Sequence, residues 1–179
     1  MTDSTLSTLH WFALKVFYNK VFEIEDTLKK ENIETYIPCE ESLSQRGETK
    51  KVVRKPIINS LMFFRATDIQ ALEVQQRLLN RVILYAQKEG FRKVPFHIPD
   101  REMNIFMLVS SSGQSGLEYF EGDQERFYLG DRVRVTDGPF KDAEGHICRI
   151  RGSRRLIVTI RGVCAIATSY IPQCFLQRI

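Results

Sequence analysis

The sequence has 179 residues, of which 43% are hydrophobic and 27% charged, as is ordinary for a water-soluble globular protein. Its formal net charge of +4 permits a nucleic-acid partner without requiring one. No run approaches the roughly 20 apolar residues of a membrane span, and the N-terminus lacks the pattern of a secretory signal. The four cysteines show neither a C-x-x-C pair nor zinc-ligand spacing with a histidine. We therefore expect a cytoplasmic protein with free thiols, no bound metal and no membrane partner.

The first forty residues predict a strand, a helix and a second strand. Residues 11–18, WFALKVFY, are aromatic and β-branched, which favours a central strand. Asn19 is placed to cap the following helix, and residues 33–38 predict the second strand. The apolar positions of the helix share one face: Val21, Ile24 and Leu28. This order within about thirty residues indicates an α/β unit.

A polar, basic segment at residues 40–56 follows. Arg46 with Gly47 predicts a turn between the two arms of an extended hairpin, and residues 57–65 then predict an apolar strand. A basic hairpin could neutralise DNA phosphates, which would give affinity without sequence choice. The candidate nucleic-acid-binding side chains are Arg46, Lys50, Lys51, Arg54 and Lys55.

The next segment predicts a second α/β pair and a third helix. Thr67 and Gln70 fit a capping box at the start of a helix. Residues 82–86 predict a strand, residues 88–96 a loop, and Asp100 caps the third helix. The stripe expected to be buried in the second helix comprises Ile69, Leu72 and Leu79, and that of the third Met103, Phe106 and Val109.

The run SSSGQSG at residues 110–116 has the composition of a flexible linker. We therefore expect an N-terminal domain at residues 10–110, a linker at 111–129 and a C-terminal domain at 130–179. The last domain contains short runs typical of strands, separated by turns, at residues 133–135, 146–150, 156–160 and 163–167. The predicted fold class is α+β: an α/β sandwich with a central, mainly antiparallel sheet, followed by a small SH3-like β-barrel.

The order of residues after the linker matches a known sequence motif at many positions. It reads Gly-Asp-x-Val-x-Val, a turn, Gly-Pro-Phe, a spacer and then Gly-x-Ile, which resembles the KOW motif. We expect its residues mainly to build the barrel, because they supply apolar anchors and turn conformations. They are Gly130, Asp131, Val133, Val135, Gly138, Pro139, Phe140 and Gly145.

An α/β domain that opens with an aromatic strand and is joined to a KOW barrel resembles the NusG family of transcription elongation factors. The resemblance runs from about residue 10 to the C-terminus. Residues 11–20 and 56–66 look most like the UpxY-type paralogues, which act on surface (capsular) polysaccharide operons. Where NusG-like proteins commonly carry Phe-Pro-Gly-Tyr, this chain has Ile58-Asn59-Ser60-Leu61, which indicates a specialised paralogue.

The resemblance implies a non-catalytic transcription elongation or antitermination factor without cofactors. Its N-terminal domain would bind the clamp helices of RNA polymerase and DNA near the transcription bubble. The side chains expected to dock on the polymerase are Trp11, Phe12, Ile58, Leu61 and Phe63. The barrel loop expected to recruit the ribosome or the termination factor Rho comprises Ile160, Arg161, Gly162 and Val163.

Two other functions remain open from the residues alone. A ribosome- or RNA-binding KOW protein would use the basic stretch at residues 149–161, but would leave the first domain unexplained. An enzyme is disfavoured, because the three histidines stand in no catalytic signature and the chain has no Gly-rich phosphate loop. For the docking side chains, a purely structural core role is the competing interpretation. We expect a monomer.

Overall fold

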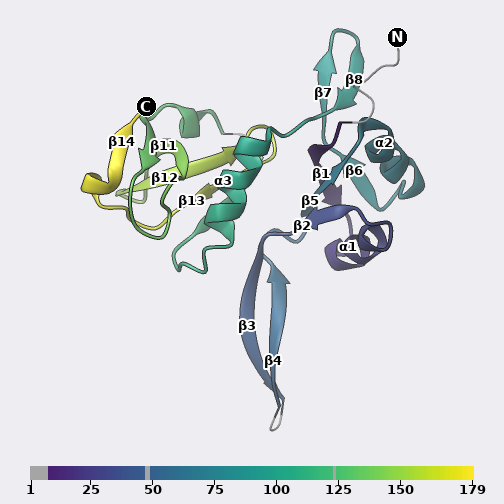
Figure 1. Ribbon diagram of the computed structural model, residues 1–179, viewed down its shortest axis with the longest axis horizontal. Coiled ribbons are helices and arrows are strands. Elements are labelled where there is room, and N and C mark those ends of the chain that lie inside the picture. Colours follow the sequence, from purple (N-terminus) through teal and green to yellow (C-terminus); the bar gives the residue numbers. More distant parts are fainter. Residues whose placement is uncertain (1–7, 47–48, 123) are drawn as a thin grey trace. The chain divides into compact units, whose positions relative to one another are not determined.

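The computed structural model describes residues 8–46, 49–122 and 124–179 (Figure 1). The chain divides into two compact units, Met1–Asp100 and Arg101–Ile179. The sequence-based division placed the end of the first domain at residue 110. In the structure the helix α3 (Asp100–Ser110) groups with the second unit instead.

A four-stranded sheet forms the centre of the first unit. Its strands are, in spatial order, β2 (Glu34–Tyr36), β5 (Leu61–Ala66), β1 (His10–Val16) and β6 (Val82–Leu84). Every neighbouring pair is antiparallel, as in Ala13 opposite Phe63 and Leu14 opposite Leu84. The predicted α+β fold with a central antiparallel sheet is confirmed.

Two helices cover one face of this sheet, α1 (Val21–Lys30) and α2 (Asp68–Arg77) (Figure 1). Alternate residues of β1 and β5 reach this core, including Phe12 and Phe64, whose ring centroids lie 5.5 Å apart. The helix positions predicted from the α1 stripe are buried there, as Ile24 illustrates.

Two details of the helices differ from the sequence prediction. The N-cap of α1 is Lys20, not Asn19, which instead adopts a positive φ of 54°. The capping box of α2 is confirmed, but its predicted stripe is wrong, since Ile69, Leu72 and Leu79 are about half exposed. Ala71, Val74 and Leu78 are buried in their place, at spacings of three and four residues that put them on another face of the helix.

Two β-hairpins, each a two-stranded sheet, extend the first unit. One joins β3 (Cys39–Arg46) to β4 (Thr49–Pro56), and the other joins β7 (Ala86–Glu89) to β8 (Arg92–Pro95). The second was expected to be a loop. Strands β2 and β6 run in opposite directions, so the two hairpins leave the sheet at opposite ends (Figure 1).

The second unit contains a six-stranded antiparallel sheet, the predicted SH3-like domain. In spatial order its strands are β14 (Leu176–Arg178), β10 (Arg132–Val135), β11 (Glu144–Ile150), β12 (Ser153–Ile160), β13 (Cys164–Ala167) and β9 (Glu118–Glu121). The first edge strand in the chain, β9, lies in the segment expected to be a linker and pairs with β13. Short 3-10 helices occur at Glu125–Tyr128 and Gln173–Phe175.

The segment expected to be a linker also contributes to the core of the second unit. Phe127 is 1% exposed and packs with Ile150, Ile157 and Ala165, and its ring meets Phe120 at 5.0 Å. Aromatic residues at 119–128 therefore explain why this stretch folds onto the sheet. None of the helices among the described residues combines the length and apolarity needed to cross a bilayer.

Candidate functional site

The face of the central sheet opposite α1 and α2 is apolar at its middle, with Arg65 at one end and Lys15 at the other. By strand alternation and register, Trp11 and Ala13 of β1 lie on this face with Leu61 and Phe63 of β5. All four side chains are buried, as is Ile58 in the segment leading into β5. The structure thus brings four of the five expected docking residues to this face or to the segment beside it.

Phe12 belongs to the other face. It is fully buried in the cluster beneath α1 and α2, and its ring also contacts His97 edge-on at 5.4 Å. Its side chain is a core group. Phe12 could contribute to a docking surface only indirectly, by packing against the helices and so holding β1 in place.

One end of the apolar face is open, and sequence reasoning missed it. Lys15 pairs with Leu61 on one side and Ile83 on the other, so the three side chains share this face. Lys15 is exposed and Ile83 is 50% exposed, whereas its strand neighbours Val82 and Leu84 are buried in the core. The alternation of β6 could have indicated an outward Ile83.

The long hairpin β3–β4 divides its charges between its base and its end. At the base, Glu40 lies opposite Lys55 and Glu41 opposite Arg54. Nearer the turn, Lys50 and Lys51 lie opposite Gln45 and Ser44, which carry no charge. Opposite charges in directly paired positions offset each other, so the uncompensated positive charge lies near the turn.

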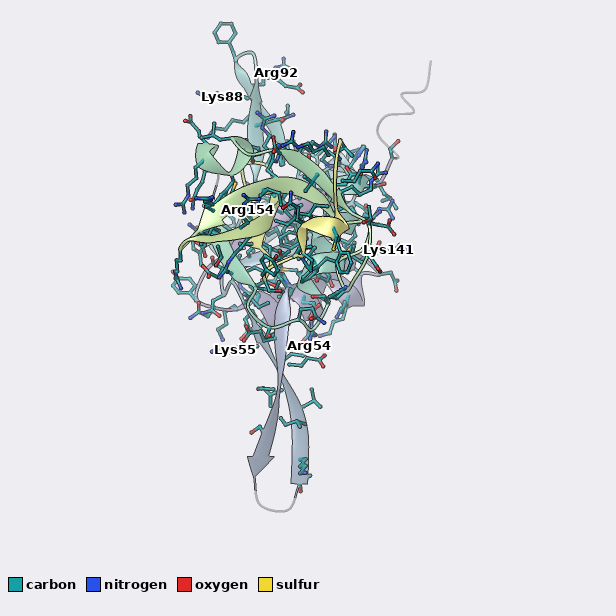
Figure 2. The ribbon with its side chains drawn as sticks, turned by 90° about the vertical axis from the view of Figure 1, so that its left-hand side faces the viewer. Arg54, Lys55, Lys88, Arg92, Lys141 and Arg154 are labelled. Carbon is teal, nitrogen blue, oxygen red and sulfur yellow. The ribbon has the colours of Figure 1, made fainter. Side chains whose placement is uncertain are left out.

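Arg54 is held in place at the base of the hairpin. Its guanidinium lies 3.5 Å from the carboxylate of the buried Glu25 and 5.2 Å from the ring centre of Phe22. It also donates to the sulfur of Cys39 at 3.6 Å. Figure 2 shows Arg54 and Lys55 near the base. Arg54 therefore ties the hairpin to α1.

The lysines of this hairpin have no such anchors. Among the described residues, Lys50, Lys51 and Lys55 make no ion pair within 4 Å, and all three are exposed. Residues 47 and 48 and the side chain of Arg46 lie outside the described parts, so the predicted turn and that cation are not placed.

Most KOW residues have structural positions in the barrel. Val133, Val135 and Phe140 are buried, and Pro139 follows Gly138, whose φ is +85°. Asp131 is exposed and pairs with Arg178 at 2.9 Å, which joins the start of β10 to β14.

Two of the motif glycines are required by close backbone approaches. A Cβ at Gly130 would lie 1.8 Å from the carbonyl oxygen of Ile147, and one at Gly145 would lie 2.1 Å from that of Ile157. Any side chain there must displace backbone of β11 or β12. These positions keep neighbouring segments of the sheet close together.

The expected partner loop forms the turn between β12 and β13. Ile160 and Val163 are buried, whereas Arg161 and Gly162 are exposed. The guanidinium of Arg161 lies 5.8 Å from the ring centre of Tyr128, a cation–π contact. Only the two central residues of this loop are presented to solvent.

The basic residues of the second unit largely pair with carboxylates. The buried Glu144 accepts from Arg101 of α3 at 2.5 Å and from Arg134 at 2.6 Å, with Arg132 at 3.5 Å. Burial alone would raise the pKa of Glu144, but hydrogen bonds from Arg134 and Arg101 bring it below its ordinary value.

The basic stretch expected to bind RNA is likewise partly neutralised. Arg155 and Arg151 lie 2.7 and 3.8 Å from the carboxylate of Glu118. Arg149 and Arg154 face each other across β11 and β12 and make no ion pair among the described residues. Together with Arg161, which contacts the ring of Tyr128 but makes no ion pair among the described residues, they are the cations of this stretch that remain for an anion.

His10, Asp68 and His97 come together although they are far apart in sequence, and their potential ligand atoms lie within 4.8 Å of one another. His97 Nε2 lies 2.6 Å from an Asp68 oxygen, and the two imidazoles stack at 4.0 Å with planes 8° apart. Parallel rings aim their nitrogens side by side, whereas a tetrahedral metal needs them to converge. These residues could hold a divalent ion only after the rings turn.

Known proteins resemble this chain in sequence. A family model described as "Transcription termination factor nusG" matches residues 9–107. The "Transcription termination/antitermination protein NusG" of Thermus thermophilus is 32% identical over 152 residues, covering 80% of this chain and 78% of that protein. A solved structure described as "Domain interaction in Thermotoga maritima NusG" is 17% identical, covers 96% of this chain and 98% of its own, and gives a TM-score of 0.45.

The family model covers more than half of the chain, and with the Thermus relative it defines the class of protein as transcription termination and antitermination factors. This chain belongs to the NusG family.

Proposed function

We propose that this chain is a non-catalytic elongation and antitermination factor whose first domain binds the clamp helices of RNA polymerase. The observation that supports this best is the apolar sheet face ending in the exposed Ile83. A helical partner docks on such a face through a few large side chains, here Trp11, Leu61 and Phe63. Because these are buried, docking requires that the face become accessible, and the open end offers the first point of attachment.

The same end of the sheet carries the second element of the proposal. The β3–β4 hairpin leaves the sheet beside Lys15 and Leu61, the end at which Ile83 is exposed. We propose that its cations bind DNA near the transcription bubble while the sheet face holds the polymerase. Lys50 and Lys51 carry most of this binding, with Arg46 and Lys55 adding charge, because Arg54 is engaged by Glu25.

A pair of matched substitutions tests the docking face. Ile83 and Ile69 are 50% and 48% exposed, but only Ile83 lies on the proposed face. We expect Ile83→Glu to weaken co-purification with RNA polymerase by about 2 kcal/mol, roughly thirty-fold, because it places a charge on the exposed apolar part of the proposed interface. Ile69→Glu should bind like the parent protein. Equal binding by both variants, with folding intact by circular dichroism, would refute the face.

We also propose that the factor is cytoplasmic, acts as a monomer and serves surface (capsular) polysaccharide operons. The resemblance of residues 11–20 and 56–66 to UpxY-type paralogues supports this specialisation. In a deletion strain, RNA abundance should fall with distance from the promoter only in such operons. A uniform fall across all long operons would instead mark a general factor.

The second domain is proposed to recruit the ribosome or Rho through Arg161 and Gly162. A function as a ribosome- or RNA-binding protein remains the second candidate, because Arg149 and Arg154 are exposed and unpaired by carboxylates among the described residues. Tight binding to ribosomal RNA that Arg154→Gln abolishes, without any polymerase association, would favour that function.

A further inference from the structure

The second hairpin of the N-terminal unit has a composition that packing does not explain. Gly90 and Phe91 form the two-residue connection between β7 and β8, and Gly90 has a φ of +60° at the first central position, the arrangement of a type II′ turn. All residues from Ala86 to Lys93 are exposed. This hairpin therefore adds little to the core.

Phe91 occupies the end of the hairpin and is fully exposed, at 110% of its reference area. Burying a phenylalanine is worth roughly 1.5–3 kcal/mol, and Phe91 gains none of it in the free protein. A turn tolerates polar residues at this position, so the ring is not needed to make the turn. Both faces of an aromatic ring are available to a partner.

Two lysines lie close to this end of the hairpin. Lys88 lies directly opposite Lys93, and Arg92 directly opposite Glu89. Like charges in directly paired positions are destabilising, and no ion pair compensates the two lysines among the described residues. Figure 2 shows Lys88 and Arg92 near the end of the hairpin. An anionic partner would relieve the repulsion between the lysines.

An exposed aromatic ring flanked by unpaired cations fits one kind of partner especially well. Single-stranded nucleic acid offers phosphates to the cations and unstacked bases to the ring. A duplex offers the same phosphates, but a base must first be unstacked, which costs a few kcal/mol per step. An acidic protein would satisfy the charges and leave the ring without a planar partner.

We propose that the end of the β7–β8 hairpin binds single-stranded nucleic acid, with Phe91 stacked on a base and Lys88 and Lys93 beside its phosphates. This site goes beyond the proposed function, because it lies at the opposite end of the sheet from the β3–β4 hairpin. It is a second, separate site for nucleic acid. It does not depend on polymerase docking.

The test measures binding of the full chain to labelled oligonucleotides of one sequence, as single-stranded DNA, single-stranded RNA and duplex DNA. To remove binding by the β3–β4 hairpin, all measurements are made with Lys50→Gln and Lys51→Gln in place. We expect Phe91→Ala to weaken single-strand binding about ten-fold, since stacking is worth about 1–3 kcal/mol per base. Phe91→Trp should preserve binding, and Phe91→Leu should not, because leucine is apolar but cannot stack.

Further variants in the same assay test the role of the lysines and control for the loss of an exposed apolar side chain. Lys88→Gln with Lys93→Gln should reduce the slope of log affinity against log salt by about 0.7 for each phosphate that the lysines no longer neutralise. Leu79→Ala removes another side chain exposed by 62% and should change nothing. Binding to single-stranded DNA, to single-stranded RNA or to both supports the site and shows which nucleic acid it accepts.

Three results would overturn the proposal: undetectable binding, equal binding by the parent and Phe91→Ala, or a preference for duplex over single strands. Since the assay contains no polymerase, its failure leaves the docking face untouched. Conversely, loss of polymerase binding in Ile83→Glu does not alter the oligonucleotide result.

Discussion

The positive charges of the two units have different surroundings. In the C-terminal unit, Glu144 and Glu118 each receive two or three arginines, and Asp131 receives Arg178. On the two N-terminal hairpins, the lysines make no ion pair among the described residues. Two basic stretches that look alike in sequence thus differ in structure: the arginines of one are mostly paired with carboxylates, and, among the described residues, the lysines of the other are not.

The residue types follow the same division. Arginine has a planar guanidinium that holds a carboxylate with two hydrogen bonds, as Arg134 does with Glu144. The lysine ammonium group is a compact, strongly hydrated charge, so it is stable in water without a carboxylate partner. Arg54, the described arginine of the β3–β4 hairpin, is the cation there that is anchored.

The largest effect is expected at Glu144. Glu144→Gln leaves three arginines around a neutral amide, and removing one partner of a buried pair costs about 3–5 kcal/mol. Because Arg101 and Arg132 are more than half exposed, we expect about 2–3 kcal/mol of lost stability in the C-terminal unit. Denaturant unfolding measures it. Asp131→Asn, which breaks an exposed pair, is the control and should change little.

The pH dependence of stability sharpens the same contrast. The folded-state pKa of Glu144 is below its unfolded value, so its stabilisation is fully present above the unfolded pKa of about 4.3 and is lost as pH falls through the folded pKa. Thermal melts should show the C-terminal unit losing stability in that acidic window. Glu144→Gln should flatten this loss, and an identical slope in parent and variant would contradict the assignment.

A smaller effect, on binding alone, is expected at the β3–β4 hairpin. Lys50→Gln with Lys51→Gln should lower affinity for nucleic acid several-fold at low salt and reduce its salt dependence, with the melting temperature unchanged. Lys55→Gln is the matched control, because Glu40 lies opposite Lys55 and already offsets its charge. If all three lysines contribute equally, the division between base and turn is wrong.

The smallest effect is expected at Arg154, which, unlike most arginines of the C-terminal unit, has no carboxylate partner among the described residues. Arg154→Gln removes one of two like charges that face each other across β11 and β12. We expect a gain of a few tenths of a kcal/mol, the usual size for such pairs. A clear loss of stability in urea unfolding would mean that Arg154 has a partner after all.

The barrel was predictable because its sequence has short alternating strands bounded by glycine turns. Strands expected at residues 133–135, 146–150 and 156–160 lie within β10, β11 and β12. The six-stranded sheet required two more strands, β9 (Glu118–Glu121) and β14 (Leu176–Arg178), whose runs are too short and too polar to stand out.

Other features depend on packing that no local pattern contains. The buried stripe of α2 was misplaced because Ile69 and Leu72 have the same spacing as Ala71 and Val74, and only the sheet decides which pair faces inward. The β7–β8 hairpin lacks apolar alternation, as expected of strands whose side chains are mostly exposed. The partners of Glu144 are ten to 43 residues away, so its role could not be read from neighbours.

The β3–β4 hairpin has a further consequence for how copies of this chain behave together. As a two-stranded ribbon it has two open edges, each eight residues long, with exposed Leu43 and Val52 paired at its middle. Such edges can extend into a continuous sheet with another copy, and lysines are a common protection against this. The lysines that we propose to bind phosphates would therefore also disfavour pairing between the hairpins of neighbouring molecules.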